Sequence, residues 1–211
     1  MIRNAFLETA SEARALITTH DVQRLWNEPS ALRGLTVGAL AAHLGRAIST
    51  VEFYVHVALP DSPRVAVTAD AYYVAVQLTR DIDDELNTSI RERSIEAAIE
   101  GHAAVVAEVD RSLASVTDAL ADEPSNRNVM VIFDIVMTLD EYLVTRLVEL
   151  ATHIDDLAFS VGRATPVLSE VTRDCVLGAL FMIARRRHGD VEVLRALTRA
   201  ERSSGGVFPV L

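Results

Sequence analysis

Hydrophobic residues recur with a helical period along most of this chain, and most clearly between residues 138 and 162. Within that segment the apolar positions have the three-, four- and seven-residue spacing of a single helix face: Leu139, Leu143, Leu150, Ile154 and Leu157. Thr138 can cap the first turn, Glu141 follows three residues later as in a capping box, and Gly162 can end the helix. The pattern predicts one long helix over 138–162 that turns an apolar stripe toward a core.

The same periodicity predicts that most of the remaining chain is helical. The expected helices cover about 4–26, 36–58, 70–80, 87–121, 169–187 and 190–201. Gly101 is expected to bend the long helix that contains it, and Trp26 is expected to pack as an anchor between the first two helices. The apolar segment 129–137 fits a helix or an extended strand. Residues 203–211 are expected to form a strand-like end.

Composition supports a single all-α domain over 1–211, with its core motifs in 26–162 and short added helices in 167–201. Half of the 211 residues are apolar, whereas glycine and proline number only 9 and 6, a balance typical of helical proteins. No repeat, low-complexity tract or shift in composition marks a second domain. A symmetric homodimer is the default expectation for the oligomeric state.

The net charge and the apolar segments exclude several classes of partner. A formal charge of −10 disfavours general binding to nucleic acid or to anionic membranes. No apolar run approaches the roughly 18 residues of a membrane span, and the N-terminus lacks the apolar core of a secretory signal. The single cysteine, Cys175, excludes an intrachain disulfide. These features predict a cytoplasmic protein that binds neither nucleic acid nor membranes.

A line of polar side chains runs beside the apolar stripe of the predicted 138–162 helix. It consists of Arg146, Glu149, His153 and Asp156, which fall within an arc of roughly 80° at about 100° per residue. A solvated face would normally lie opposite the apolar stripe, so this position predicts half-buried side chains. Glu149 and His153 are four residues apart and can converge on one point. The line fits either a functional site or a buried ion-pair network that fixes how the helices pack.

His43 lies at the edge of the apolar face of its own predicted helix. Taken alone, it fits a hydrogen-bonded histidine at the boundary of the core. Two facing helices of a bundle can bring it together with Glu149 and His153, and such a set suits a divalent transition metal with one position left open. Asp156 could then orient His153, and Arg146 could pair with Glu149 or bind the carboxylate of a ligand.

Two sequence motifs resemble a known family. Residues 26–44 read WNEPSALRGLTVGALAAHL, and residues 138–158 read TLDEYLVTRLVELATHIDDLA. Both are similar to motifs of the mycothiol-dependent maleylpyruvate isomerase N-terminal domain family, which belongs to the DinB-like metal-binding four-helix bundles. The resemblance implies an up-and-down bundle that holds a divalent metal, usually zinc, at His43, Glu149 and His153. It selects the same residues as the argument from the helix faces.

The resemblance also implies a chemistry, the transfer of a small thiol such as mycothiol to an electrophilic substrate. An open metal position would bind the thiol and lower its pKa. Loop 59–70 and the polar side chains of Tyr54, Arg146 and Asp156 are expected to shape the substrate pocket. Only a short segment follows Gly162, too short for the second domain of the isomerase. A transferase or isomerase-like reaction in the broader sense is therefore expected rather than maleylpyruvate isomerisation itself.

Two other functions are compatible with the sequence. The bundle could bind a small ligand or a partner without catalysis, with a structural metal or none. Alternatively, residues 40–54 mimic a helix-turn-helix, with Gly45 in the turn and Ser49 opening a recognition helix, as in a TetR-like regulator. Residues 49–58 contain no arginine or lysine, which disfavours contacts with DNA phosphates.

Overall fold

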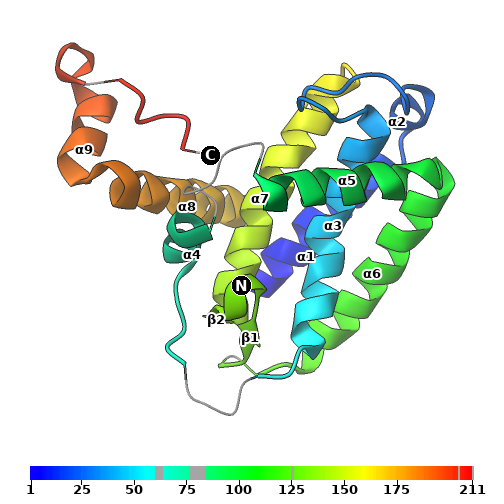
Figure 1. Ribbon diagram of the computed structural model, residues 1–211, viewed down its shortest axis with the longest axis horizontal. Coiled ribbons are helices and arrows are strands. Elements are labelled where there is room, and N and C mark those ends of the chain that lie inside the picture. Colours follow the sequence, from blue (N-terminus) through cyan, green and yellow to red (C-terminus); the bar gives the residue numbers. More distant parts are fainter. Residues whose placement is uncertain (60–63, 77–83, 125, 204, 211) are drawn as a thin grey trace.

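Four helices form the centre of the computed structural model, which describes residues 1–59, 64–76, 84–124, 126–203 and 205–210. They are α1 (Ile2–Ile17), α3 (Val37–His56), α6 (His102–Asp122) and α7 (Leu139–Ser160). α1 and α3 each pack against both α6 and α7, so that the four helices enclose one core (Figure 1). Helices make up 71% of the structure, and the prediction of an all-α bundle is confirmed.

α7 lies at the centre of the packing because it carries the predicted apolar stripe. All five residues of the stripe are fully buried: Leu139, Leu143, Leu150, Ile154 and Leu157. Burying such a side chain contributes about 1.5–3 kcal/mol relative to leaving it exposed. The Thr138 hydroxyl caps the helix by accepting a hydrogen bond from Glu141 N at 3.2 Å. The Glu141 carboxylate turns to the start of α4 (Ala69–Val76), where it accepts a hydrogen bond from Ala69 N at 2.7 Å.

Two of the predicted helices are each divided in the structure. Predicted helix 4–26 becomes α1 and the short α2 (His20–Arg24), because the Thr19 side chain caps a new helix. Predicted helix 87–121 becomes α5 (Glu85–Ile99) and α6, because Gly101 between them has a φ of +88°. That left-handed conformation cannot continue an α-helix. Gly101 therefore separates two helices instead of bending one, and α5 crosses the outside of α3 (Figure 1).

The helix-turn-helix interpretation of residues 40–54 is wrong, because α3 continues without interruption through this segment. Gly45 lies inside the helix, where a Cβ would come within 2.8 Å of the Val109 side chain of α6. The absence of a side chain at this position thus allows α3 and α6 to approach closely.

The segment 129–137, which fits a helix or a strand by its sequence, forms a small hairpin. Its strands are β1 (Asn128–Met130) and β2 (Val136–Thr138), joined by a connection that contains the turn η1 (Ile132–Asp134). The strands pair antiparallel with Val129 opposite Met137, and both of these side chains are fully buried. The hairpin therefore packs its apolar side chains onto the core of the bundle.

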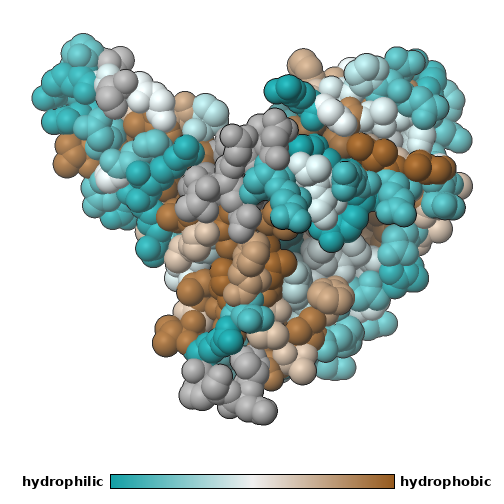
Figure 2. Space-filling view, viewed as in Figure 1, coloured by the Kyte–Doolittle hydropathy of each residue, from teal (hydrophilic) through white to brown (hydrophobic). Residues whose placement is uncertain are grey.

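A second group of helices forms an arm beside the bundle (Figure 1). Besides α4, it contains α8 (Glu170–His188), α9 (Asp190–Thr198) and the turn η2 (Ala200–Arg202). α8 packs against α4 and α7, and the Arg186 guanidinium forms an ion pair with the buried carboxylate of Asp70 in α4. Figure 2 shows a mainly hydrophilic surface at the far end of the arm and a more hydrophobic one where the arm joins the bundle.

Some predictions fall partly outside the described residues. Residues 60–63 of the predicted loop 59–70 and residues 77–80 of the predicted helix 70–80 are not described. The tail that was expected to be strand-like contains no strand among its described residues, although Val207 and Val210 are buried. In the described part of the chain, no helix combines the length and the hydrophobicity needed to cross a membrane.

Trp26 lies in the segment that follows α2 and packs against the start of α3 and against α5, in the position expected of an anchor between the first two predicted helices. Its indole Nε1 donates a hydrogen bond to Ala98 O of α5 at 3.1 Å, and its ring lies against Gly38. A Cβ at Gly38 would lie 2.4 Å from Trp26 Cε2. Only displacement of the indole or of the helix could relieve that clash, and the hydrogen bond to α5 opposes movement of the indole.

We expect Gly38→Ala to lower the free energy of unfolding by about 1–3 kcal/mol, the usual cost of overpacking. Gly178→Ala is the matched control, because Gly178 also lies within a helix and a Cβ there would meet nothing within 4 Å. The control should be neutral or stabilise the protein by up to about 1 kcal/mol through helix propensity. Chemical unfolding of the three proteins measures both effects. Equal stability of Gly38→Ala and the wild type would contradict this packing of Trp26.

Candidate metal centre

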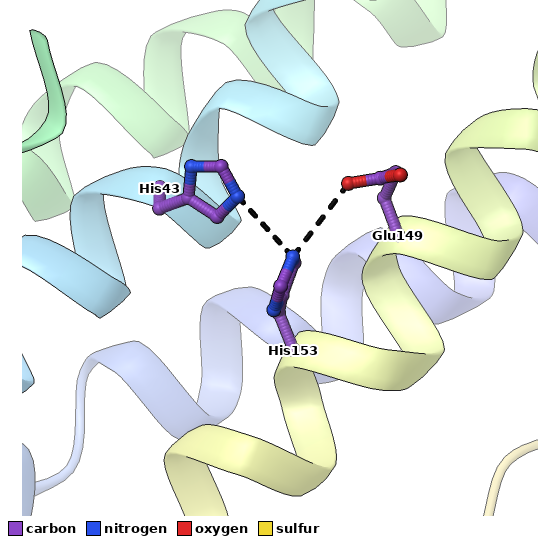
Figure 3. Close-up of side chains that lie close together, drawn as sticks. All are labelled: His43, Glu149 and His153. Atoms are coloured by element: carbon purple, nitrogen blue, oxygen red, sulfur yellow. Dashed lines mark hydrogen bonds and ion pairs between the residues drawn. The ribbon is translucent and has the colours of Figure 1, made fainter. Parts of the chain in front are cut away.

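Three side chains that can bind a metal converge between α3 and α7 (Figure 3). His43 Nε2 lies 3.2 Å from His153 Nε2, and His153 Nε2 lies 3.6 Å from Glu149 Oε2. One ligand atom from each residue falls within 4.8 Å of the other two. A tetrahedral metal with bonds of about 2.0–2.2 Å separates its ligand atoms by about 3.4 Å. The two separations that involve His153 are close to this value, and the structure thus gathers the three residues predicted as ligands into one candidate metal site.

Both histidines are held by a hydrogen bond at the nitrogen that faces away from the cluster. Ser94 of α5 is fully buried, and its hydroxyl donates to Ile90 O at 2.9 Å. Its oxygen can therefore accept a hydrogen bond from Nδ1–H of His43, 3.3 Å away, which leaves His43 Nε2 free of a proton. The Asp156 carboxylate lies 3.0 Å from His153 Nδ1 and orients that ring in the same way.

Tyr73 of α4 holds the carboxylate of the cluster. Its hydroxyl lies 3.0 Å from Glu149 Oε1 and 3.1 Å from Thr145 O, and the side chain is buried. Such partners orient metal ligands and raise metal affinity. The sequence predicts Asp156 in this role but gives no sign of Ser94 or Tyr73. No local pattern could have found them, because α4 and α5 reach the cluster only through the packing of the folded chain.

Burial and neighbouring charges separate the pKa values of the three groups. Burial lowers the pKa of His43 to about 4, and the adjacent His153 adds to this effect. Burial also opposes protonation of His153, but hydrogen bonds to Asp156 and Glu149 outweigh it and raise its pKa to about 9. Burial would raise the pKa of Glu149, yet His153 and Arg146 lower it to about 2. Near neutral pH the metal-free cluster therefore contains neutral His43, ionised Glu149 and protonated His153.

We expect the affinity for zinc to rise about tenfold per pH unit between pH 6 and 8. The raised pKa of His153, about 9, means that this imidazole must lose a proton before it can bind a metal. At lower pH a larger fraction of His153 carries the proton that competes with the metal, so the affinity falls as the pH falls. Neither His43, with a pKa of about 4, nor Glu149, at about 2, changes its charge in this range. Competition with a chromophoric chelator at pH 6, 7 and 8 measures the slope, and an affinity independent of pH would contradict this protonation pattern.

A cavity of about 410 Å³ adjoins the cluster. His43 and Glu149 form part of its wall, together with Tyr54 and Arg146, two of the polar residues expected to shape a substrate pocket. The third expected residue, Asp156, holds the His153 ring instead. Among its described residues, loop 59–70 contributes nothing to the lining. α5 and the turn η1 contribute instead, through Leu86, Ile90, Arg93 and Ile132.

Arg146 is part of the cavity wall rather than part of an ion-pair network. Its Nε lies 3.1 Å from Thr145 Oγ1, and its guanidinium lies 5.1 Å from the centre of the Tyr142 ring. In the part of the chain that the structure describes, it forms no ion pair with Glu149. The alternative interpretation of the polar line as an ion-pair network therefore applies only to His153, which contacts Glu149 and Asp156.

The fold and the cluster together define a class of protein, the helical bundle with a candidate divalent-metal site between two core helices. Residues 6–158 match the sequence model of the family described as Mycothiol maleylpyruvate isomerase N-terminal domain. The match covers more than two thirds of the 211-residue chain, and the chain belongs to this family. The resemblance inferred from the two motifs is confirmed. No curated protein and no solved structure matches the chain.

Proposed function

We propose that this protein is a metal-dependent enzyme that transfers a small thiol, such as mycothiol, to an electrophilic small molecule or uses it in an isomerisation. The observation that carries the proposal is the convergence of His43, Glu149 and His153 beside a cavity, in a member of this family. Zinc is the proposed metal, because two imidazoles and one carboxylate suit it.

The surroundings of the cluster support an open metal site. Three protein ligands leave a tetrahedral ion one further position. His43 and Glu149 also line the cavity, so a small molecule bound there would lie beside the cluster. A divalent metal held by the three residues would lower the pKa of a bound thiol, so that the thiolate is present near neutral pH.

The residues of the chain would orient both reactants. Ser94 and Asp156 fix the two imidazole rings, and Tyr54 and Arg146 would contact the thiol or the electrophile from the cavity wall. A transfer forms one carbon–sulfur bond, whereas in an isomerisation this bond forms and then breaks again, so that the thiol is released unchanged. The thiol proton then goes to the product when a double bond is attacked, or leaves with the departing group when one is displaced.

Incubation of the zinc-loaded protein with small thiols and model electrophiles tests this function. We expect mass spectrometry to show the thiol–electrophile adduct forming faster than with the His153→Ala variant. His56→Ala is the control, because it also removes an imidazole, but from an exposed position on α3. Its rate should equal that of the wild type. Equal rates for all three proteins would contradict the proposal.

A bundle that binds a small ligand without turnover is the second candidate, and the cavity is the observation that favours it. Saturable binding of a small molecule, with no adduct formed from any pair of thiol and electrophile, would support this candidate against the enzyme.

A further inference from the structure

α4 connects the arm to the candidate metal centre (Figure 1). It is a helix of eight residues, and so short a helix is not stable in water by itself. Its position therefore depends on its neighbours, and it packs more extensively against α8 than against α7. Two of its side chains, one turn apart, make the polar contacts: Asp70 reaches α8 and Tyr73 reaches α7. A change where α4 meets α8 can therefore alter the surroundings of the metal ligands on α7.

The contact between α4 and α8 contains a buried charge. Only 10% of the Asp70 side chain is exposed, and its carboxylate forms an ion pair with the guanidinium group of Arg186. Burial would raise the pKa of Asp70, but hydrogen bonds with Thr68 and Arg186 outweigh burial and hold this pKa below its ordinary value. A buried carboxylate that loses its counter-ion is strongly destabilised. The ion pair therefore favours one position of α4 on the arm.

The contact between α4 and α7 is made at the metal ligand Glu149. The Tyr73 hydroxyl lies 3.0 Å from Glu149 Oε1 and 3.1 Å from Thr145 O, and its one proton can be donated to either acceptor. The other carboxylate oxygen, Glu149 Oε2, lies 3.6 Å from His153 Nε2. Tyr73 thus binds one oxygen of the carboxylate, and the second oxygen is the one that lies beside the other ligands.

We propose that the ion pair between Arg186 and Asp70 positions the metal ligand Glu149. The pair holds α4 in place, so that the Tyr73 hydroxyl occupies Oε1 of Glu149 and leaves Oε2 for the metal. The family match ends at residue 158, whereas Arg186 lies on α8. The arm therefore supplies a positioning residue that the matched segment does not contain. This role rests on the metal centre of the proposed function but not on the transfer of a thiol.

The zinc affinities of four proteins test whether Arg186 acts through Tyr73. They are the wild type, Arg186→Gln, Tyr73→Phe and the double variant. We expect Tyr73→Phe to weaken zinc binding by about 10- to 100-fold, the usual effect of losing a hydrogen-bond partner of a ligand. Arg186→Gln should weaken it by about 3- to 30-fold, as for a residue that acts on a site through packed neighbours. The double variant should bind zinc as Tyr73→Phe does, because both substitutions act on the same contact.

Two further variants separate the ion pair from general effects of charge and stability. Arg173→Gln is the control for charge, because Arg173 also lies on α8 but is exposed. Its zinc affinity should equal that of the wild type. Asp70→Asn breaks the same ion pair without leaving a buried charge unpaired, so it keeps the test valid even when Arg186→Gln is destabilised. It should weaken zinc binding to the same degree as Arg186→Gln.

Cobalt bound in place of zinc reports the geometry of the centre. Tetrahedral cobalt absorbs visible light more strongly than cobalt with a larger number of ligands. When Tyr73 no longer occupies Oε1, Glu149 can bind the metal through both oxygens and so add a ligand. We expect weaker absorption from the cobalt-loaded Tyr73→Phe and Arg186→Gln variants than from the wild type and Arg173→Gln. A loss of overall stability alone would not change the spectrum of the bound ion.

Three results would overturn the role of Arg186. They are equal zinc affinity in Arg186→Gln, Asp70→Asn and Arg173→Gln, a loss in Arg186→Gln that is just as large when Tyr73 is replaced, and identical cobalt spectra in all variants. Each of them leaves the proposed function standing, because the wild type still binds the metal. A wild type that binds no zinc would overturn both proposals. A failure of thiol transfer alone does not affect these measurements.

Discussion

His153→Ala is expected to lower the affinity for zinc by more than about 100-fold. Losing a residue that only holds a ligand by a hydrogen bond costs up to about 100-fold, and losing a ligand itself should cost more. His153 is the side chain that contacts both other members of the cluster, with its Nε2 3.2 Å from His43 and 3.6 Å from Glu149. Its removal leaves two ligands, on different helices, for one ion. Competition with a chelator of known affinity measures the change.

His56→Ala is the control for this substitution, because it also removes an imidazole, but from an exposed position on α3. Its zinc affinity should equal that of the wild type. Circular dichroism of both variants establishes that the bundle is retained, since His153 also bridges two buried or half-buried carboxylates. An unchanged zinc affinity in folded His153→Ala would remove this residue from the site.

Asp156→Asn is expected to weaken zinc binding by about 10- to 100-fold, the usual effect of changing a hydrogen-bond partner of a ligand. The Asp156 carboxylate lies 3.0 Å from His153 Nδ1, where it fixes the ring and makes Nε2 a stronger donor to a metal. Asparagine has nearly the same shape but no charge, and its amide can present a nitrogen to the ring instead of an oxygen. The pKa of His153 should fall as well, because this hydrogen bond helps to raise it against the effect of burial.

Asp155→Asn provides the matched control, one residue away on α7. Asp155 is exposed and pairs with the Thr165 hydroxyl, away from the cluster. A chelator competition and an NMR titration of His153 should therefore distinguish the two variants. Equal zinc affinity in Asp155→Asn and Asp156→Asn would show that Asp156 has no influence on the centre.

The helical fold and the α7 half of the site could be predicted because they depend on a local period. The spacing along α7 alone places Glu149 and His153 on one side of the helix, and Asp156 within reach of His153. The partner from α3 was harder to identify. Its position on a helix face made His43 a candidate for the cluster, and the family resemblance separately selected the same residue. A single helix carries no information about which neighbour it will face, so the pairing of α3 with α7 could not be read from one helix alone.

The remaining features depend on how the helices cross. Ser94 reaches His43 because Gly101 turns the chain, so that α5 lies across α3. The sequence shows Gly101 but not its positive φ. It therefore predicts one bent helix where the structure has two separate helices. Arg46 and Arg93 are brought to one cavity by the same crossing. Tyr73 lies on α4 and contacts Glu149. The start of α4 is bound to α7 by the hydrogen bond from Ala69 N to the Glu141 carboxylate, whereas the sequence predicts that Glu141 completes a capping box.

The central claim is that His43, Glu149 and His153 bind one divalent metal ion. An anomalous difference map, recorded at the zinc absorption edge from crystals of the zinc-loaded protein, tests it most directly. We expect one strong peak between α3 and α7, about 2.0–2.2 Å from His43 Nε2, His153 Nε2 and a carboxylate oxygen of Glu149. A map with no peak at this position, in crystals that contain zinc in excess, would contradict it.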